Sequence, residues 1–300
     1  MIVPIIKRDT YLNRLERLRD VASKEGYDNF VIYGDREHFA NITWFTGYDP
    51  RFEEALLVID LKEDRKPLLM VGNEGLGYVD ISPIRKHLQV QLFQSFSLPS
   101  QPRGESKPLS ELLRSGGIKR GRRIGAAGWK YFSNIEFDKP ESILDIPSYI
   151  VDSLRSISGE SNVLNGSNIL IHPTEGIRVV NDVDQIAYTE YASTIASQAV
   201  KDLVFNIRPG MNEFDAVRLM KLNGMPLSCH VMLSTGSKAK MGLASPSNRV
   251  IQKCEPFTVA YGVWGSLTAR AGFVAENEKD LPPRIRNYVD VLVVPYFDAI

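Results

Sequence analysis

Hydrophobic and polar positions in the first half of the chain follow two alternating patterns. The first has helical spacing, three or four residues apart, and predicts a helix that ends before Gly26; its apolar positions are Leu12, Leu15, Leu18, Val21 and Ala22. Short apolar runs typical of buried strands follow it, at residues 29–33, 55–59, 67–71, 90–93 and 123–127. A helical piece over 109–113, ended by two glycines, separates the last two runs. Strands interleaved with helices predict an α/β domain.

The second half reads differently. A long apolar stripe over 183–204 predicts a helix, and Arg208-Pro209-Gly210 breaks the chain before a shorter helix over 213–222. Candidate strands follow at residues 228–234, 257–264 and 268–275, and an amphipathic segment covers 285–297. We therefore predict an α/β domain over 1–172 and an α+β domain over 173–300.

Composition narrows the classes of function. Lys plus Arg and Asp plus Glu number 36 each, so no net field attracts nucleic acid or an anionic membrane. The first residues are too short and too soon charged for a signal peptide, and no apolar run is long enough to span a bilayer. Cys229 and Cys254 have no metal-ligand spacing, which argues against a disulfide framework or a zinc site. We expect a cytoplasmic protein that binds neither nucleic acid nor membrane.

Two regions resemble the creatinase/prolidase/aminopeptidase P family. Tyr33–Gly47 contains an Asn-Ile-x-aromatic-apolar-Thr-Gly segment similar to one in the amino-terminal domain of that family. The second region begins with the long helix and the turn over 207–213, which resembles a basic-Pro-Gly-x-Asn-Glu motif. Its later segments, 234–236, 245–249 and 257–270, resemble the family's pocket strands. The resemblance implies a creatinase-like amino-terminal domain followed by a pita-bread domain.

The same resemblance locates the family's metal-binding residues. Hydrolases of this family carry one Asp on each strand of a hairpin, and these carboxylates bridge two divalent metals that activate water. The matching positions here are Ala260 and Leu267, and the family's pocket His corresponds to Ala244. None of these three side chains binds a metal. The resemblance therefore predicts no metal site, and Mn, Zn or Co is expected only if the matching of positions is wrong.

Four residues are candidates for chemistry or recognition. His230 is a candidate acid/base, because a neutral imidazole accepts a proton near pH 7; alternatively, it only hydrogen-bonds at a strand edge. Arg270 either anchors a substrate carboxylate or forms a salt bridge within the fold. Arg51 and His38 lie in charged loops that the resemblance brings toward a partner subunit's substrate, although such loops are also ordinary exposed turns.

Other features carry less weight. The two cysteines are interpreted as packing residues rather than nucleophiles. Gly72, Gly75 and Gly77 suggest a nucleotide-binding loop, but no Lys-Ser/Thr follows them, and we reject that reading. The family's pita-bread domain has two similar halves, and only the first is matched here. We therefore expect a partly present domain and a fragment of a longer chain.

Three functions remain open. The first is a homodimeric hydrolase that cleaves a C–N bond of a small amino-acid-like or guanidino substrate without the dinuclear metal site. The second is a non-catalytic pita-bread protein that binds a small ligand or a protein partner. The third is a metal-dependent Xaa-Pro peptidase.

Overall fold

The computed structural model describes residues 3–299, which form two compact units. One is Ile6–Asp182; the other comprises residues 183–299 with residues 3–5. The boundary that the sequence suggested, after residue 172, lies within the first unit. The reason is a set of contacts from the segment that follows it: Arg178 Nη1 donates to Asn41 Oδ1 at 2.6 Å, and Asp182 pairs with Arg14 at 2.7 Å.

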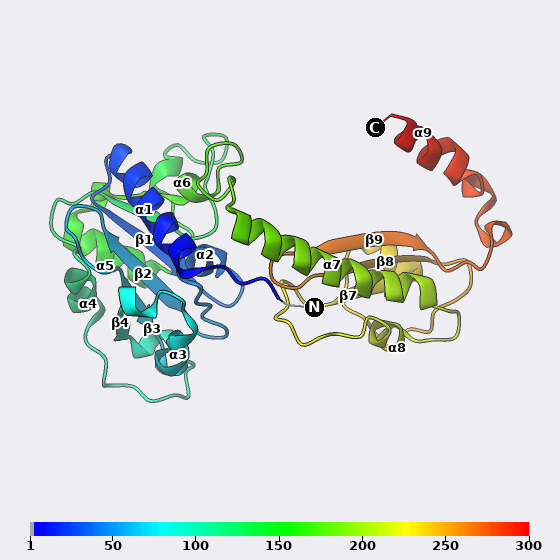
Figure 1. Cartoon of the computed structure of the whole chain (residues 1–300), viewed down its shortest axis with the longest axis horizontal. Helices are drawn as coiled ribbons and strands as arrows, with labels where there is room; N and C mark the ends of the chain where they lie inside the picture. Colours follow the sequence, from blue (N-terminus) through cyan, green and yellow to red (C-terminus); the bar gives the residue numbers. More distant parts are fainter. Residues whose placement is uncertain (1–2, 300) are drawn as a thin grey trace. The chain divides into compact units, whose positions relative to one another are not determined.

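The first unit is built on a six-stranded sheet in the order β4-β3-β2-β1-β5-β6 (Figure 1). Its strands are β1 Asn29–Gly34, β2 Ala55–Asp60, β3 Leu68–Val71, β4 Gln89–Leu92, β5 Ile124–Ala127 and β6 Val163–Asn165. β2 is antiparallel to β1 and β3, whereas the other neighbours are parallel. The five predicted strands are confirmed, and β6 is an addition.

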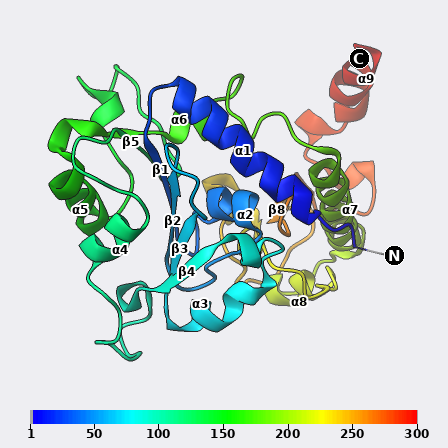
Figure 2. The ribbon, with the colours of Figure 1, turned by 60° about the vertical axis from the view of Figure 1, so that its left-hand side comes forward.

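Helices cover both faces of this sheet, with α4 and α5 on one side and α1 and α2 on the other (Figure 2). Their bounds are α1 Arg8–Lys24, α2 Ala40–Thr46, α3 Asn73–Tyr78, α4 Leu109–Ser115, α5 Ser148–Ser158 and α6 Ser167–Ile171. Because side chains alternate along a strand, β1 serves two cores. Phe30 and Ile32 pack with α1 and α2, while Val31 and Tyr33 pack with α4 and α5. Burial on both faces explains why the sequences of β1, β2 and β3 are almost unbroken apolar runs.

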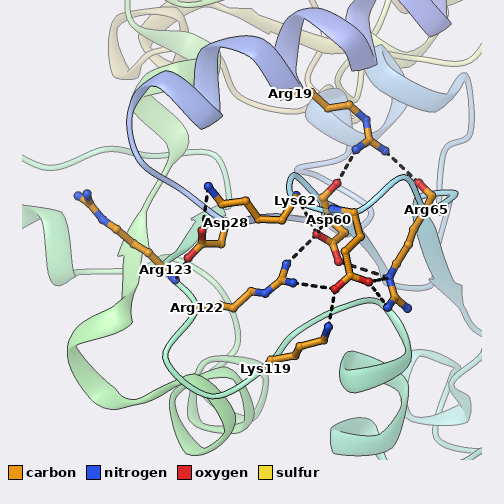
Figure 3. A network of polar contacts seen from close by, with 9 residues as sticks. Arg19, Asp28, Asp60, Lys62, Arg65, Lys119, Arg122 and Arg123 are labelled. Carbon is orange, nitrogen blue, oxygen red and sulfur yellow. Dashed lines mark hydrogen bonds and ion pairs between the residues drawn. The ribbon is translucent and has the colours of Figure 1, made fainter.

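A charged network at one end of the sheet ties together α1, β2 and the segment before β5 (Figure 3). Asp60 is 1% exposed. Its Oδ1 accepts from Arg122 Nη1 at 2.8 Å, and Arg122 Nη2 reaches Glu63 at 2.9 Å. Lys119 also pairs with Glu63. These cations have carboxylate partners within the fold, so the network is a structural brace.

The second unit is a three-stranded antiparallel sheet packed on one long helix. Its elements are α7 Val183–Asn206, α8 Glu213–Arg218, β7 Met232–Thr235, β8 Pro256–Tyr261 and β9 Thr268–Phe273, followed by a π-helical turn Val289–Val293 and α9 Val294–Asp298. Leu233, Val259 and Tyr261 pack against Ala192 and Ala196 of α7. The long helix is confirmed. β7 begins four residues later than predicted, and α8, β8 and β9 end earlier.

Candidate functional site

The sheet of the second unit has a face turned away from α7, which we call the outer face. Ala260 on β8 pairs with Ala269 on β9. Alternation along the strands puts both side chains on the outer face, and Leu267, two positions before Ala269, shares it. The Cα of Leu267 lies 3.0 Å from where a Cβ on Gly262 would stand, so the turn here is tight. The two positions that the resemblance matches to metal-binding aspartates thus lie together on one face.

The residues of the outer face do not fit a dinuclear metal centre. Such a centre needs several carboxylate or imidazole ligands, and Ala260 and Leu267 have no donor atom. Ser234 and Thr258 supply hydroxyl groups, but these hydrogen-bond to one another at 2.9 Å. Within residues 3–299, no group of three or more His, Cys, Asp or Glu side chains is placed to hold a metal ion.

A cavity of about 980 Å³ opens along the outer face. Its apolar wall includes Ala271 and Phe273 of β9. Charged side chains of both signs complete the lining: Lys240 and Arg286 are basic, and Glu276, Glu278 and Asp290 are acidic. A cavity with an apolar wall and both signs of charge suits a small zwitterion such as an amino acid or a short peptide.

One loop of the cavity is held by a buried carboxylate that the sequence did not reveal as such. Glu213 is fully buried. Its Oε1 accepts from the backbone N–H of Thr235 at 2.8 Å and from that residue's hydroxyl at 2.9 Å. Its Oε2 accepts from Lys238 Nζ at 2.9 Å and from the backbone N–H and the hydroxyl of Ser247 at 2.8 and 2.7 Å. The carboxylate therefore fastens both ends of the loop that carries Ala244.

The environment of Glu213 favours its ionised form. Burial acts to raise the pKa of this carboxyl, but hydrogen bonds from Ser247, Lys238 and Thr235 lower it, and the net shift is downward. Glu213 also lies in the first turn of α8, where a carboxylate favours the positive end of the helix dipole. The capping side chain of this helix is Asn212, whose Oδ1 accepts from Asp215 N at 2.9 Å.

His230 lies outside the strand on which we expected it. β7 begins at Met232, and His230 precedes it in an exposed, irregular segment. Among the residues that the structure describes, no side-chain hydrogen bond orients its imidazole. Its neighbour Cys229 and the more distant Cys254 are half-buried free thiols. The catalytic role of His230 stays a prediction.

Arg270 faces α7 rather than the outer face. It pairs with Val259, which is buried in the α7 core, so alternation sends both side chains to that side. The guanidinium is exposed, and Nη1 donates to the carbonyl of Ala269 at 2.7 Å. No salt bridge within the described chain engages it, so of the two readings the structural ion pair lacks support.

His38 and Arg51 belong to the first unit, and each has a local partner. His38 Nδ1 lies 3.1 Å from Asp35 Oδ1, and its ring stacks on Trp129 at a centroid distance of 4.2 Å. The guanidinium of Arg51 lies over the Tyr78 ring at 3.9 Å. Among the described residues, His38 and Arg51 do not contact each other and share no partner.

The glycine run after β3 is shaped by a carboxylate of the protein itself. Glu53 is 2% exposed, and its Oε2 accepts from Gly75 N at 2.8 Å. A Cβ on Gly72 would lie 2.6 Å from Glu53 Cδ. The carboxylate occupies the place where a phosphate would bind at a helix N-terminus, which is consistent with rejecting the nucleotide-loop reading.

Comparisons with known proteins identify the fold. Neither protein-family models nor curated proteins match this chain. Among solved structures, the prolidase from Pyrococcus horikoshii aligns with a TM-score of 0.63 at 16% identity, covering 89% of this chain and 67% of that one. The Xaa-Pro dipeptidase from Bacillus anthracis gives 0.64 at 13% identity, covering 94% and 69%. The X-Pro aminopeptidase from Thermotoga maritima gives 0.63 at 15% identity, covering 93% and 69%.

The chain therefore has the fold of prolidases and X-Pro aminopeptidases, as its motifs indicated, and it spans about two thirds of their length. The expectation of a partly present pita-bread domain agrees with this coverage. No helix of the described chain has both the length and the apolar character needed to cross a membrane.

Proposed function

We propose that this chain is a prolidase-fold protein that binds a small amino-acid-like or peptide ligand on its outer face without a dinuclear metal centre. The observation that carries the proposal is the pairing of β8 with β9. In this register Ala260 pairs with Ala269, and a cavity of about 980 Å³ lies farther along the same two strands, at residues 256–258 and 271–273. The same face therefore has a concave site, and the side chains of Ala260 and Leu267 have no atom that binds a metal.

The charges that line the cavity support an amino-acid-like ligand. Lys240 and Arg286 are suited to a carboxylate, and Glu276 and Asp290 to an ammonium or guanidinium group. Phe273 and Ala271 supply apolar contact for the body of the ligand. Neither wall offers a paired nucleophile and base, which favours binding over chemistry in this part of the fold.

A second candidate is hydrolysis of a C–N bond in the same ligand, without metal. The fold of known prolidases favours it. His230 remains the candidate acid/base. In that case the carboxylate anchor in the cavity is Lys240 or Arg286, because Arg270 faces α7.

We also propose that the working form is a cytoplasmic homodimer. The free thiols of Cys229 and Cys254 suit a reducing compartment, and the resemblance to dimeric creatinase-like proteins supports self-association. Light scattering of the purified chain tests the dimer, and a monomer at micromolar concentration would refute it.

The deciding experiment combines metal analysis, calorimetric titration and product analysis on one preparation. The protein is exposed to manganese, zinc and cobalt, dialysed, and assayed for metal per chain. Xaa-Pro dipeptides and small guanidino compounds are then titrated, and the mixtures are analysed by mass spectrometry. A K240Q variant serves as the cavity probe, and K279Q, an exposed lysine outside the cavity, serves as the matched control.

Each outcome separates the candidates. Saturable binding without product and without bound metal, weakened by K240Q and not by K279Q, supports the binding function. Product formation without metal that is lost in H230A supports the hydrolase. Near two metals per chain with cleavage of Xaa-Pro peptides overturns both and establishes a metal-dependent peptidase.

A further inference from the structure

A second concave site lies at the α7 side of the sheet and reaches around the edge strand β9. α7 and the edge strand β9 border a groove of about 530 Å³, which we call the α7–β9 groove. Its floor includes Val200 and Phe257, which are 2% and 4% exposed. Val204 and Phe205 extend the apolar wall. Gly272 leaves room for the Phe257 ring, because a Cβ there would lie 2.9 Å from a ring carbon.

Two cations line this apolar groove. Lys201 comes from α7, one turn after Ser197, and Arg270 comes from β9. Within residues 3–299, neither side chain forms an ion pair, in contrast to the cations of the charged network in the first unit. Arg270 donates one N–H to the carbonyl of Ala269, and its guanidinium has further N–H groups that can donate to a ligand. Both side chains therefore keep N–H groups that can donate to an anion bound in the groove.

We propose that the α7–β9 groove binds a straight-chain monocarboxylate. Its carboxylate group lies between Lys201 and Arg270, and its hydrocarbon chain runs along Val200, Val204 and Phe205. The volume lies within the range of small-molecule sites, roughly 300–1,000 Å³. The groove shares Phe257, Ala271, Gly272, Phe273 and Tyr288 with the cavity of the proposed function, because both border β9. Lys201, Arg270, Val200 and Val204, which carry this proposal, line the groove alone. Arg270 thereby anchors a carboxylate in this groove rather than in the cavity of the outer face.

The test uses the whole chain and three probes: octanoate, octanol and acetate. Octanoate has both the charge and the apolar chain, octanol lacks the charge, and acetate lacks the chain. Isothermal titration is expected to show saturable binding of octanoate that is about ten-fold or more tighter than that of either other probe. Octanol lacks the charge-assisted contact, which typically contributes at least a factor of ten, and acetate lacks the methylene groups whose burial stabilises the complex.

Three variants identify the groove as the place of binding. K201Q and R270Q are each expected to weaken octanoate binding about ten-fold, while K279Q, an exposed lysine in the same unit, leaves it unchanged. Circular dichroism confirms that each variant is folded; since Lys201 is exposed on a helix, K201Q keeps the test valid if R270Q unfolds.

The opposite results overturn the proposal. Equal affinity for octanol and octanoate removes the role of the charge, and equal affinity for acetate and octanoate removes that of the apolar chain. Octanoate binding that survives both K201Q and R270Q places the ligand elsewhere. An equal loss in K279Q shows a general charge effect rather than a site.

Discussion

Replacing Glu213 with alanine is the most direct perturbation of the second unit. The carboxylate accepts five hydrogen bonds from Thr235, Lys238 and Ser247 and has no exposed surface. Truncation removes the acceptor of the backbone N–H groups of Thr235 and Ser247 and one of the acceptors of the Lys238 ammonium. A buried donor without an acceptor retains its full desolvation penalty.

The expected loss of stability follows from these contacts. Removing one partner of a buried ion pair costs about 3–5 kcal/mol. Lys238 keeps an acceptor in the carbonyl of Ser245 at 2.6 Å, and its side chain is 27% exposed. We therefore expect Glu213→Ala to lower the free energy of unfolding by ~3 kcal/mol, the lower end of this range. A loss of this size lowers the Tm of a unit of this size by roughly 10 °C. Glu213→Gln keeps the volume but loses the charge, and is expected to lose about 2 kcal/mol.

The pH dependence provides a second signature of the same carboxyl. Its pKa in the folded protein lies below the ordinary value of 4.5. The stability it contributes is therefore fully present above pH 4.5 and is lost as the pH falls through the folded pKa. Glu213→Gln has no such group, so its unfolding free energy is expected to depend less on pH below 4.5 than that of the wild-type protein.

Scanning calorimetry measures Tm, and hydrogen exchange of peptides from β7 and β8 shows whether the loss is confined to the second unit. Glu190→Ala, an exposed position on α7, is the matched control and is expected to stay within about 0.5 kcal/mol of wild type. A Glu213→Ala protein with unchanged Tm, or a control that loses as much, would refute the bracing role.

Three further outcomes are expected. The double variant A260D/L267D places two carboxylates on the outer face. Added Mn²⁺ should raise the Tm of this variant, but not that of the wild-type protein, in a differential scanning fluorimetry titration. An unchanged Tm of the variant would contradict the placement of both positions on one face. Asp60→Asn removes a buried charge from the network of Figure 3 and should lower the free energy of unfolding by about 2 kcal/mol in urea titrations. Gly75→Ala should destabilise by about 1–3 kcal/mol, since its Cβ would lie 2.9 Å from that of Val71, whereas Gly77→Ala, with nothing within 4 Å, should be neutral or stabilising.

The strands of the first unit were predictable because they are buried on both faces. The run 30–33 is apolar at every position, so its interpretation as a strand depends on no partner. The short helices of this unit could not be predicted in the same way. Within Tyr33–Gly47 the helix α2 escaped prediction because it has only seven residues, Ala40–Thr46, and ends where Gly47 takes φ +68°. A helix this short depends on tertiary packing more than on propensity.

The candidate site shows a different limit of sequence reasoning. Family motifs placed Ala260 and Leu267 on one hairpin, and the strand register agrees, because pairing between adjacent strands is a local property. The role of Glu213 depends on Thr235 and Ser247, which lie 22 and 34 residues away in the chain, and no local pattern reports contacts of that range.

The predicted position of His230 on a strand was wrong because of a contact that the sequence does not reveal. The sequence predicts a strand over 228–234, with pairing from its first residue. In the structure Ser228 is drawn to the turn between β8 and β9 instead: its N–H donates to the carbonyl of Gly262 at 3.1 Å, and its hydroxyl donates to that of Ser266 at 2.8 Å. The chain between Ser228 and Met232 must then bulge out of the sheet, which exposes His230. An imidazole without an orienting hydrogen bond is a weak general base, so activity at this position requires a ligand, a partner or another part of the chain to orient it.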